Sequence, residues 1–223
     1  MRAQRLRRHL PLDIDLGAVL AVPAVVAATE DQVRFAYTRA WRRTANTLQK
    51  RALQQLKTTL APKKLRDIRR RILTFYSRRN ANDLGEMVLW FGLNQMRVRD
   101  LRGRLSGPRQ HQSRDPKTGR FVSARRGSSR RYAEFRSAGR LGTLRFEEGY
   151  IAGRGAQRTL YQFDSQTRRA READAAIYAP ALDVIEDTVL DDVAALFFHH
   201  FNQDITRRVK YQIHADKRGQ RSR

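Results

Sequence analysis

Two groups of side chains have the types and spacing that could support chemistry at a metal ion. Asp183, Asp187 and Asp191 recur at four-residue steps, so one helix face could present three carboxylates to a divalent cation. No His or Glu is spaced toward them, and a solvated acidic stripe opposite an apolar one explains the same pattern. His199 and His200 are adjacent, and adjacent helical residues point about 100° apart, which is poor geometry for chelating one ion. We therefore expect no metal site.

A glycine-rich segment at 149–155 could suggest a phosphate loop. It lacks the Lys-Ser/Thr pair and the strand–turn–helix context of such a loop, so a turn between strands is the expected structure. The sequence has no Ser-His-Asp order, nucleophile elbow or kinase signature. We expect a protein that is not an enzyme and that uses no cofactor.

The basic runs are the stronger chemical signal. Paired arginines could neutralise phosphates, and Phe121, Tyr132 and Phe135 lie among them and could stack on bases. The same runs could instead form a solvated surface or salt bridges between subunits. The candidate contacts with other subunits or with nucleic acid are therefore the arginine pairs and the three aspartates at four-residue spacing: Arg69, Arg70, Arg78, Arg79, Arg125, Arg126, Arg130, Arg131, Asp183, Asp187 and Asp191.

Charge is abundant and unevenly distributed. The 223 residues carry 46 Lys and Arg against 22 Asp and Glu, a formal net charge of +24, and no cysteine. Between residues 172 and 206 there are eight acids and neither Lys nor Arg. A chain with one acidic helix face and basic arms can attract polyanions and also copies of itself.

A long helix is predicted near the N-terminal end of the globular part. Thr29 and Gln32 have capping-box spacing, and Pro62 marks the helix end. Between them one apolar stripe recurs mostly at four-residue steps: Val33, Tyr37, Trp41, Leu48, Ala52, Leu56 and Leu60.

A short basic helix at 63–71 and a β-hairpin are predicted next. The hairpin strands are expected at 73–76 and 86–93, with a turn-rich connector between them and continuation of the sheet at 96–101. Tyr76, Trp90 and Phe91 are expected on the sheet, in the core. Further strands are expected near 140–146, 150–153 and 159–163.

A second long helix is predicted to begin at Pro180. Its apolar stripe comprises Leu182, Ile185, Val189, Val193, Phe197, Phe201, Ile205 and Val209. Acids lie toward its beginning and bases toward its end, which complements the helix dipole.

These elements predict an α+β fold: a long N-terminal helix and a long C-terminal helix packed on a small antiparallel β-sheet. Residues 29–101 and 140–213 are expected to form one core domain, and 102–139 a basic Gly/Ser/Arg-rich insertion or arm. Residues 1–28 are a predicted N-terminal extension and 214–223 a basic tail. The apolar stretch at 16–28 is shorter than the roughly 20 residues of a membrane span, so no membrane association is expected.

Residues 89–96 (LWFGLNQM) carry a family resemblance. They are similar to the W-[FY]-G-L-N-P strand end of the minor tail protein Z, or tail-completion, family of tailed bacteriophages, with Gln95 where proline is common. The run AWRRTAN at 40–46 and the Arg-Arg-Arg-Ile at 69–72 also resemble that family. The resemblance covers roughly residues 33–96.

The resemblance implies a structural virion protein of the tail and neck, assembled in the host cytoplasm. It implies a sixfold homo-oligomeric ring around the DNA path at the head-proximal end of the tail, where head and tail join. The implied partners are further copies of the chain, tail-terminator, tail-tube or head-connector proteins, and DNA in the channel. A basic, sequence-nonspecific nucleic-acid-binding protein is the alternative reading of the same charges.

Overall fold

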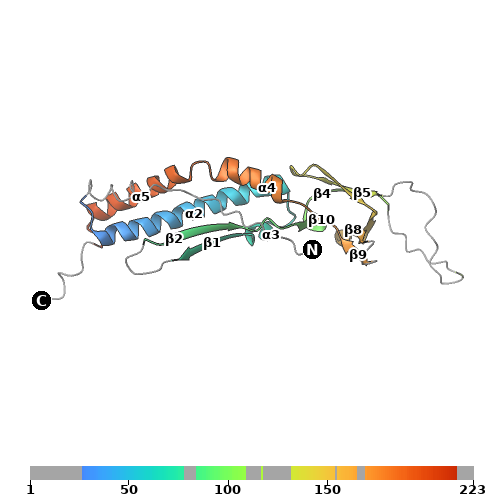
Figure 1. The fold of residues 1–223 in the computed structure, drawn as a ribbon, viewed down its shortest axis with the longest axis horizontal. Helices are drawn as coiled ribbons and strands as arrows, with labels where there is room; N and C mark the ends of the chain where they lie inside the picture. The colour runs from blue at the N-terminus through green and yellow to red at the C-terminus, as the bar shows by residue number, and fades with distance from the viewer. Residues whose placement is uncertain are drawn as a thin grey trace. The chain divides into compact units, whose positions relative to one another are not determined.

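The computed structural model describes residues 27–77, 84–108, 117, 132–153, 155–164 and 169–214. Helices and strands run in the order α2 (Glu30–Leu60), α3 (Leu65–Arg69), β1 (Ile72–Ser77), β2 (Glu86–Phe91), β3 (Met96–Arg97), η1 (Val98–Asp100), β4 (Gly103–Ser106), β5 (Tyr132–Ser137), β6 (Thr143–Glu147), β7 (Gly149–Ala152), η2 (Gly155–Gln157), β8 (Thr159–Asp164), β9 (Arg169–Glu172), β10 (Asp174–Ala175), α4 (Tyr178–Val184), η3 (Ile185–Val189) and α5 (Val193–Lys210) (Figure 1). The α+β prediction, with a long helix near each end and small antiparallel sheets between, is confirmed.

The chain divides into two compact units, where the sequence predicted one core domain. The helical unit comprises Met1–Arg51, Thr74–Leu89 and Val189–Arg223, and the sheet unit comprises Ala52–Leu73 and Trp90–Thr188. The helix α2 and the strands β1 and β2 contribute residues to both. The single-domain prediction rested on the two apolar helix stripes, and such stripes do not reveal where the packing contacts of a long helix change partners.

In the helical unit, α2 lies between α5 on one side and the β1–β2 ribbon on the other (Figure 1). The core joins the predicted stripes of the two helices, with Tyr37 and Trp41 of α2 against Phe197 of α5 at ring-centroid distances of 5.5 and 4.7 Å. Ala36 and Ala40, which are fully buried, allow close approach of the helices. Met87 of β2 packs on the same cluster, so the ribbon covers it from the hairpin side.

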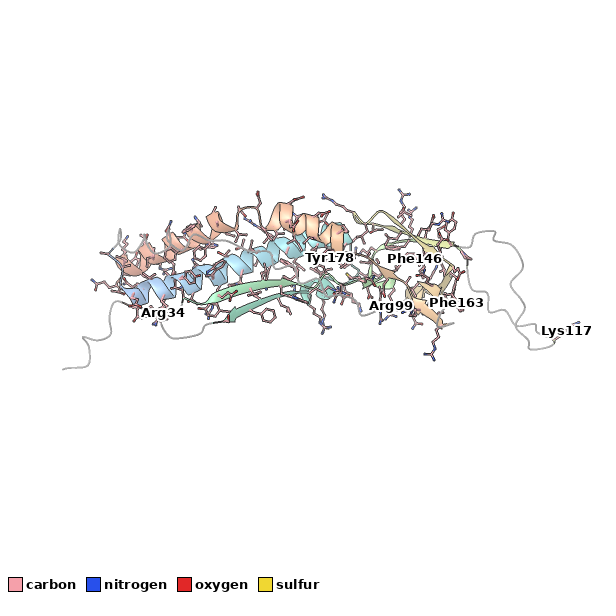
Figure 2. The ribbon with its side chains drawn as sticks, in the orientation of Figure 1. Arg34, Arg99, Lys117, Phe146, Phe163 and Tyr178 are labelled. Atoms are coloured by element: carbon pink, nitrogen blue, oxygen red, sulfur yellow. The ribbon has the colours of Figure 1, made fainter. Side chains whose placement is uncertain are left out.

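The sheet unit contains three small antiparallel sheets. Their strand orders are β4-β5-β6, β7-β8-β9 and β10-β3. Phe135 of β5 and Leu160 of β8 are fully buried, and Phe146 of β6 is nearly so (Figure 2). Backbone hydrogen bonds tie the sheets to the end of α2, as in the 2.7 Å bond from Arg140 N to the Thr59 carbonyl.

Two strands lie within the predicted basic arm, which corrects its boundaries. β4 pairs with β5 so that Leu105 faces Phe135, and the buried Phe135 anchors both strands. Along these two strands, apolar and charged residues alternate over only a few positions. Such a short alternation within a basic segment is not a recognisable strand signal in the sequence. The predicted continuation of the sheet through 96–101 is likewise shorter: β3 has two residues, and a 3-10 turn follows it.

The predicted closing helix is interrupted. After α4 the chain makes a π-helical turn, η3, and leaves helical geometry at residues 190–192 before α5 begins. The Thr188 hydroxyl donates to the Val184 carbonyl over 2.5 Å, a back-bond that competes with the regular helical ladder. Ile185, Val189 and Val193 remain buried through the interruption, so the apolar stripe is preserved although the helix is not.

Candidate functional site

The outer face of the β1–β2 ribbon is the first candidate surface. Phe75 of β1 and Val88 of β2, both in the helical unit, are exposed, with Phe75 at 54% exposure. Leu73 and Trp90, which belong to the sheet unit, are exposed as well, with Trp90 at 45%. Strand alternation places these positions opposite Tyr76 and Met87, which face α2. The expectation that Trp90 lies in the core is therefore wrong: one face of the ribbon is already filled by α2, and Trp90 is on the other.

The inner face of the same ribbon is fixed by polar contacts as well as apolar ones. The hydroxyls of Tyr76 and Thr38 of α2 lie 3.3 Å apart, and the Tyr76 hydroxyl donates to the Leu84 carbonyl over 3.0 Å. Gln49 of α2 donates to the Thr74 hydroxyl. These bonds orient the ribbon on α2 and leave its outer apolar residues facing solvent.

A basic cleft in the sheet unit is the second candidate surface. It has a volume of about 430 Å³ and is lined by four cations, Lys63, Arg99, Arg104 and Arg158. They come from four separate places in the chain, namely the residues before α3, η1, β4 and the turn after η2. Sequence reasoning missed this cleft because none of the four belongs to an arginine pair.

Local backbone contacts bring the cationic residues of the basic cleft together. Lys63 N donates to the Asp100 carbonyl over 2.8 Å, which joins the segment before α3 to η1. Arg99, labelled in Figure 2, lies 3.3 Å from Glu172 and 3.8 Å from Asp100 through its Nε. At Gly103 a Cβ would lie 2.3 Å from the Arg136 carbonyl oxygen, so only glycine allows β4 to approach β5 this closely.

The predicted site residues are dispersed. Arg69 and Arg70 are exposed at the end of α3 in the sheet unit. Asp183 of α4 and Asp187 of η3 are exposed in the same unit, whereas Asp191 belongs to the helical unit. The π-helical turn and the break at 190–192 remove the regular four-residue spacing that the prediction assumed. Arg78, Arg79, Arg125, Arg126, Arg130 and Arg131 lie outside the described residues.

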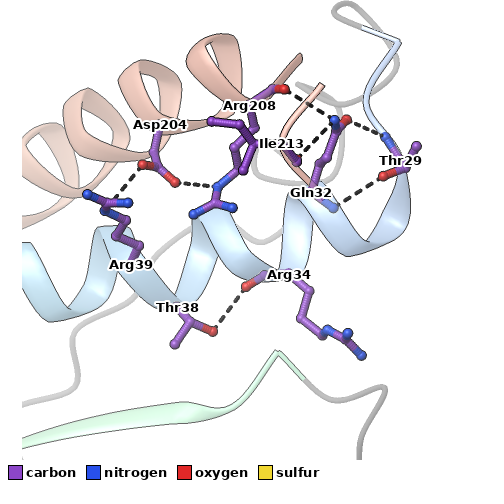
Figure 3. A network of polar contacts seen from close by, with 8 residues as sticks. All are labelled: Thr29, Gln32, Arg34, Thr38, Arg39, Asp204, Arg208 and Ile213. Carbon is purple, nitrogen blue, oxygen red and sulfur yellow. Dashed lines mark hydrogen bonds and ion pairs between the residues drawn. The ribbon is translucent and has the colours of Figure 1, made fainter. Parts of the chain in front are cut away.

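A buried ionic network lies where α2 begins and α5 ends (Figure 3). Arg208 Nε donates to Asp204 Oδ2 over 2.6 Å, and Arg39 Nε lies 3.4 Å from Asp204 Oδ1. Gln32 Nε2 donates to the carbonyls of Arg208 and Ile213, each over 3.3 Å. A cavity of about 140 Å³ adjoins the network, and because Asp204 pairs with both Arg39 and Arg208 there, we assign the network a structural role.

The histidine pair does not form a chelate. His199 and His200 have ring centroids 5.6 Å apart at an interplanar angle of 61°, and His199 is exposed. Burial lowers the pKa of His200 below its usual value, with smaller contributions from His199 and Arg43. Neither ring nitrogen of His200 has a hydrogen-bond partner among the described residues.

The described residues contain neither a cluster of metal ligands nor a membrane-spanning helix. Within ranges 27–77, 84–108, 132–153, 155–164 and 169–214, no group of three or more His, Asp or Glu is placed to hold a metal ion. No helix in those same parts of the chain is long and apolar enough to cross a membrane.

Comparisons with protein-family models, with curated proteins and with solved structures gave no match to this chain.

Proposed function

We propose that this chain is a structural, non-catalytic assembly subunit, a tail-completion component of a tailed phage. In this proposal it forms a ring around the DNA path at the head-proximal end of the tail. The similarity of residues 89–96 and 40–46 to the tail-completion family supports the proposal. Its localisation is then the virion, and its partners are tail-terminator, tail-tube or head-connector proteins.

The observation that carries the assembly proposal is the apolar outer face of the β1–β2 ribbon. A two-stranded sheet is marginal by itself, and among the residues that the structure describes it is stabilised by α2 on one side. Among the described residues, Phe75 and Val88 leave an apolar face of the helical unit exposed, which is typical of a protein–protein contact. Aromatic residues are also the usual energetic centres of interfaces.

The chain's own charges favour contact between copies of the chain. Asp183, Glu186 and Asp187 are exposed and have no ion pair with a described Lys or Arg. Exposed cations lie around α3 in the same unit, among them Arg69 and Arg70. A ring needs two different patches on each subunit, and patches of opposite sign on adjacent copies attract each other.

Native mass spectrometry of the full chain, alone and mixed with tail-tube, terminator and connector proteins, tests the proposal at moderate and high salt. We expect a discrete closed oligomer, or a stoichiometric complex with one of these proteins. A monomer that ignores all of them at every concentration would overturn the proposal.

A further inference from the structure

We propose that the basic cleft of the sheet unit binds the phosphate backbone of a nucleic acid, without sequence preference. This site is separate from the ribbon face and from the arginine pairs of the sequence, and it stands whether or not the chain assembles into a ring. Four observations carry it: the unpaired cations, the like-charge pair to which Arg104 belongs, the largely buried apolar floor, and the size of the cleft.

Most of the positive charge in the basic cleft is not neutralised by the protein. Lys63, Arg104 and Arg158 are exposed and have no ion pair with any carboxylate of the described residues. Only Arg99 is paired, with Glu172 and Asp100. Three unpaired positive charges therefore surround a concave surface. The concave shape concentrates their electrostatic potential, which attracts anions.

Arg104, which lines the basic cleft, is also half of a like-charge pair. Arg104 of β4 is directly opposite Arg136 of β5 in the antiparallel register, and both side chains are exposed. Residues opposite each other share a face of the sheet, and like charges in this position destabilise it. By contrast the neighbouring β5–β6 pair places Glu134 opposite Arg145. The unfavourable pair is expected where an external anion supplies the missing negative charge.

The floor of the basic cleft favours a polyanion backbone over an acidic peptide. Val98, Leu101 and Phe135 line it, with exposures of 2%, 1% and 1%, so they offer no apolar surface to anchor a peptide side chain. Leu105 also lines the cleft and is half-buried, so recognition rests mainly on charge. Two of the three unpaired cations are arginines, whose planar guanidinium groups match phosphate oxygens in two parallel hydrogen bonds.

The dimensions of the cleft fit a segment of backbone. Its volume of about 430 Å³ exceeds what one phosphate needs and lies within the range of about 300 to 1,000 Å³ typical of ligand sites. The cations come from separate segments, so they can contact successive phosphates of one strand, which follow each other about every 3.4 Å along a duplex axis.

The test compares the full chain with the double variant Arg104→Gln/Arg158→Gln. Binding of a short labelled duplex is measured by fluorescence anisotropy over a salt series. The matched control is Arg42→Gln/Lys50→Gln, two exposed cations of α2 in the helical unit, which removes the same net charge. We expect binding about tenfold weaker for the cleft variant at about 100 mM salt, and a salt slope lower by roughly 1.8. The control should change both quantities much less.

A charge-preserving variant and a competing polyanion serve as further controls. The charge-preserving variant Arg104→Lys/Arg158→Lys should keep the salt slope of the full chain and lose less affinity than the glutamine variant, which separates loss of charge from loss of fold. Poly-glutamate is offered to the same proteins as a competitor. Equal losses of duplex binding in the cleft variant and the control would overturn the proposal. So would loss of poly-glutamate binding by the cleft variant while its duplex binding matches the control.

Discussion

Arg208 and Asp204, one turn apart on α5, form an ion pair of 2.6 Å with side-chain exposures of only 7% and 5%. Arg39 of α2 approaches the second oxygen of the same carboxylate. The pair therefore links the C-terminal part of α5 to the N-terminal part of α2 through a buried charge. In a protein with a net charge of +24, this carboxylate holds together two arginines that would otherwise repel each other.

Replacing Asp204 by Asn should destabilise the helical unit by about 3 to 5 kcal/mol, because Arg208 would remain buried without its counter-charge. The free energy of unfolding, measured by urea denaturation followed by circular dichroism, checks this. Asp192→Asn is the matched control, since Asp192 pairs with Arg51 at a half-exposed position and should cost about 1 kcal/mol or less. If the two variants lost similar amounts of unfolding free energy, burial of the Asp204–Arg208 pair would not be what makes it stabilising.

The capping box at the start of α2 gives a second prediction. Thr29 and Gln32 exchange hydrogen bonds of 3.3 and 3.0 Å with each other's backbone N–H groups, and Gln32 is buried. Thr29→Ala should cost about 1 kcal/mol of stability. Gln32→Ala should cost more, because it also removes the bonds to the carbonyls of Arg208 and Ile213 near the end of α5. Thermal unfolding of the two variants side by side measures the order, and a reversed order would refute it.

From the lowered pKa of His200 we predict a loss of folding stability in mild acid. Its pKa in the folded protein lies below the usual value of 6.5, so the unfolded chain binds a proton that the folded chain resists. Stability from this group is thus complete above pH 6.5 or so and falls as the pH drops through the window between the unfolded and the folded pKa. In His200→Phe this part of the pH dependence should disappear, whereas His199→Gln should retain most of it. Unfolding free energies at several pH values decide between these outcomes.

If the outer face of the β1–β2 ribbon is a contact between subunits, polar substitutions there should weaken assembly. Phe75→Ser/Val88→Ser should leave the monomer folded, because both side chains are exposed, and should shift the oligomer toward monomer by at least tenfold in dissociation constant. Sedimentation velocity across a concentration series measures this. Phe163→Ser is the control, since Phe163 of β8 is also exposed but lies in another sheet. An unchanged oligomer in the ribbon variant would show that the face is not the contact.

The sequence by itself determined the elements whose signals are local. The Thr29–Gln32 spacing identified the beginning of α2, because a capping box satisfies backbone donors within one turn. The apolar steps identified the buried faces of α2 and of the segment from α4 to α5, because the helix period alone brings such residues to one side. The strands β1 and β2 followed from their composition and from the turn-forming residue types between them in the sequence.

Only the tertiary structure decided which faces and charges meet. Trp90 has the sequence signature of a core residue, but α2 fills one face of the ribbon and Trp90 is on the other. The cleft cations Lys63, Arg104 and Arg158 are far apart in sequence, and strand pairing and loop contacts gather them. The Asp204–Arg208 pair reads from sequence as an ordinary surface pair, and it is buried only because α2 packs over it. Long-range packing, which no local pattern encodes, placed each of these groups.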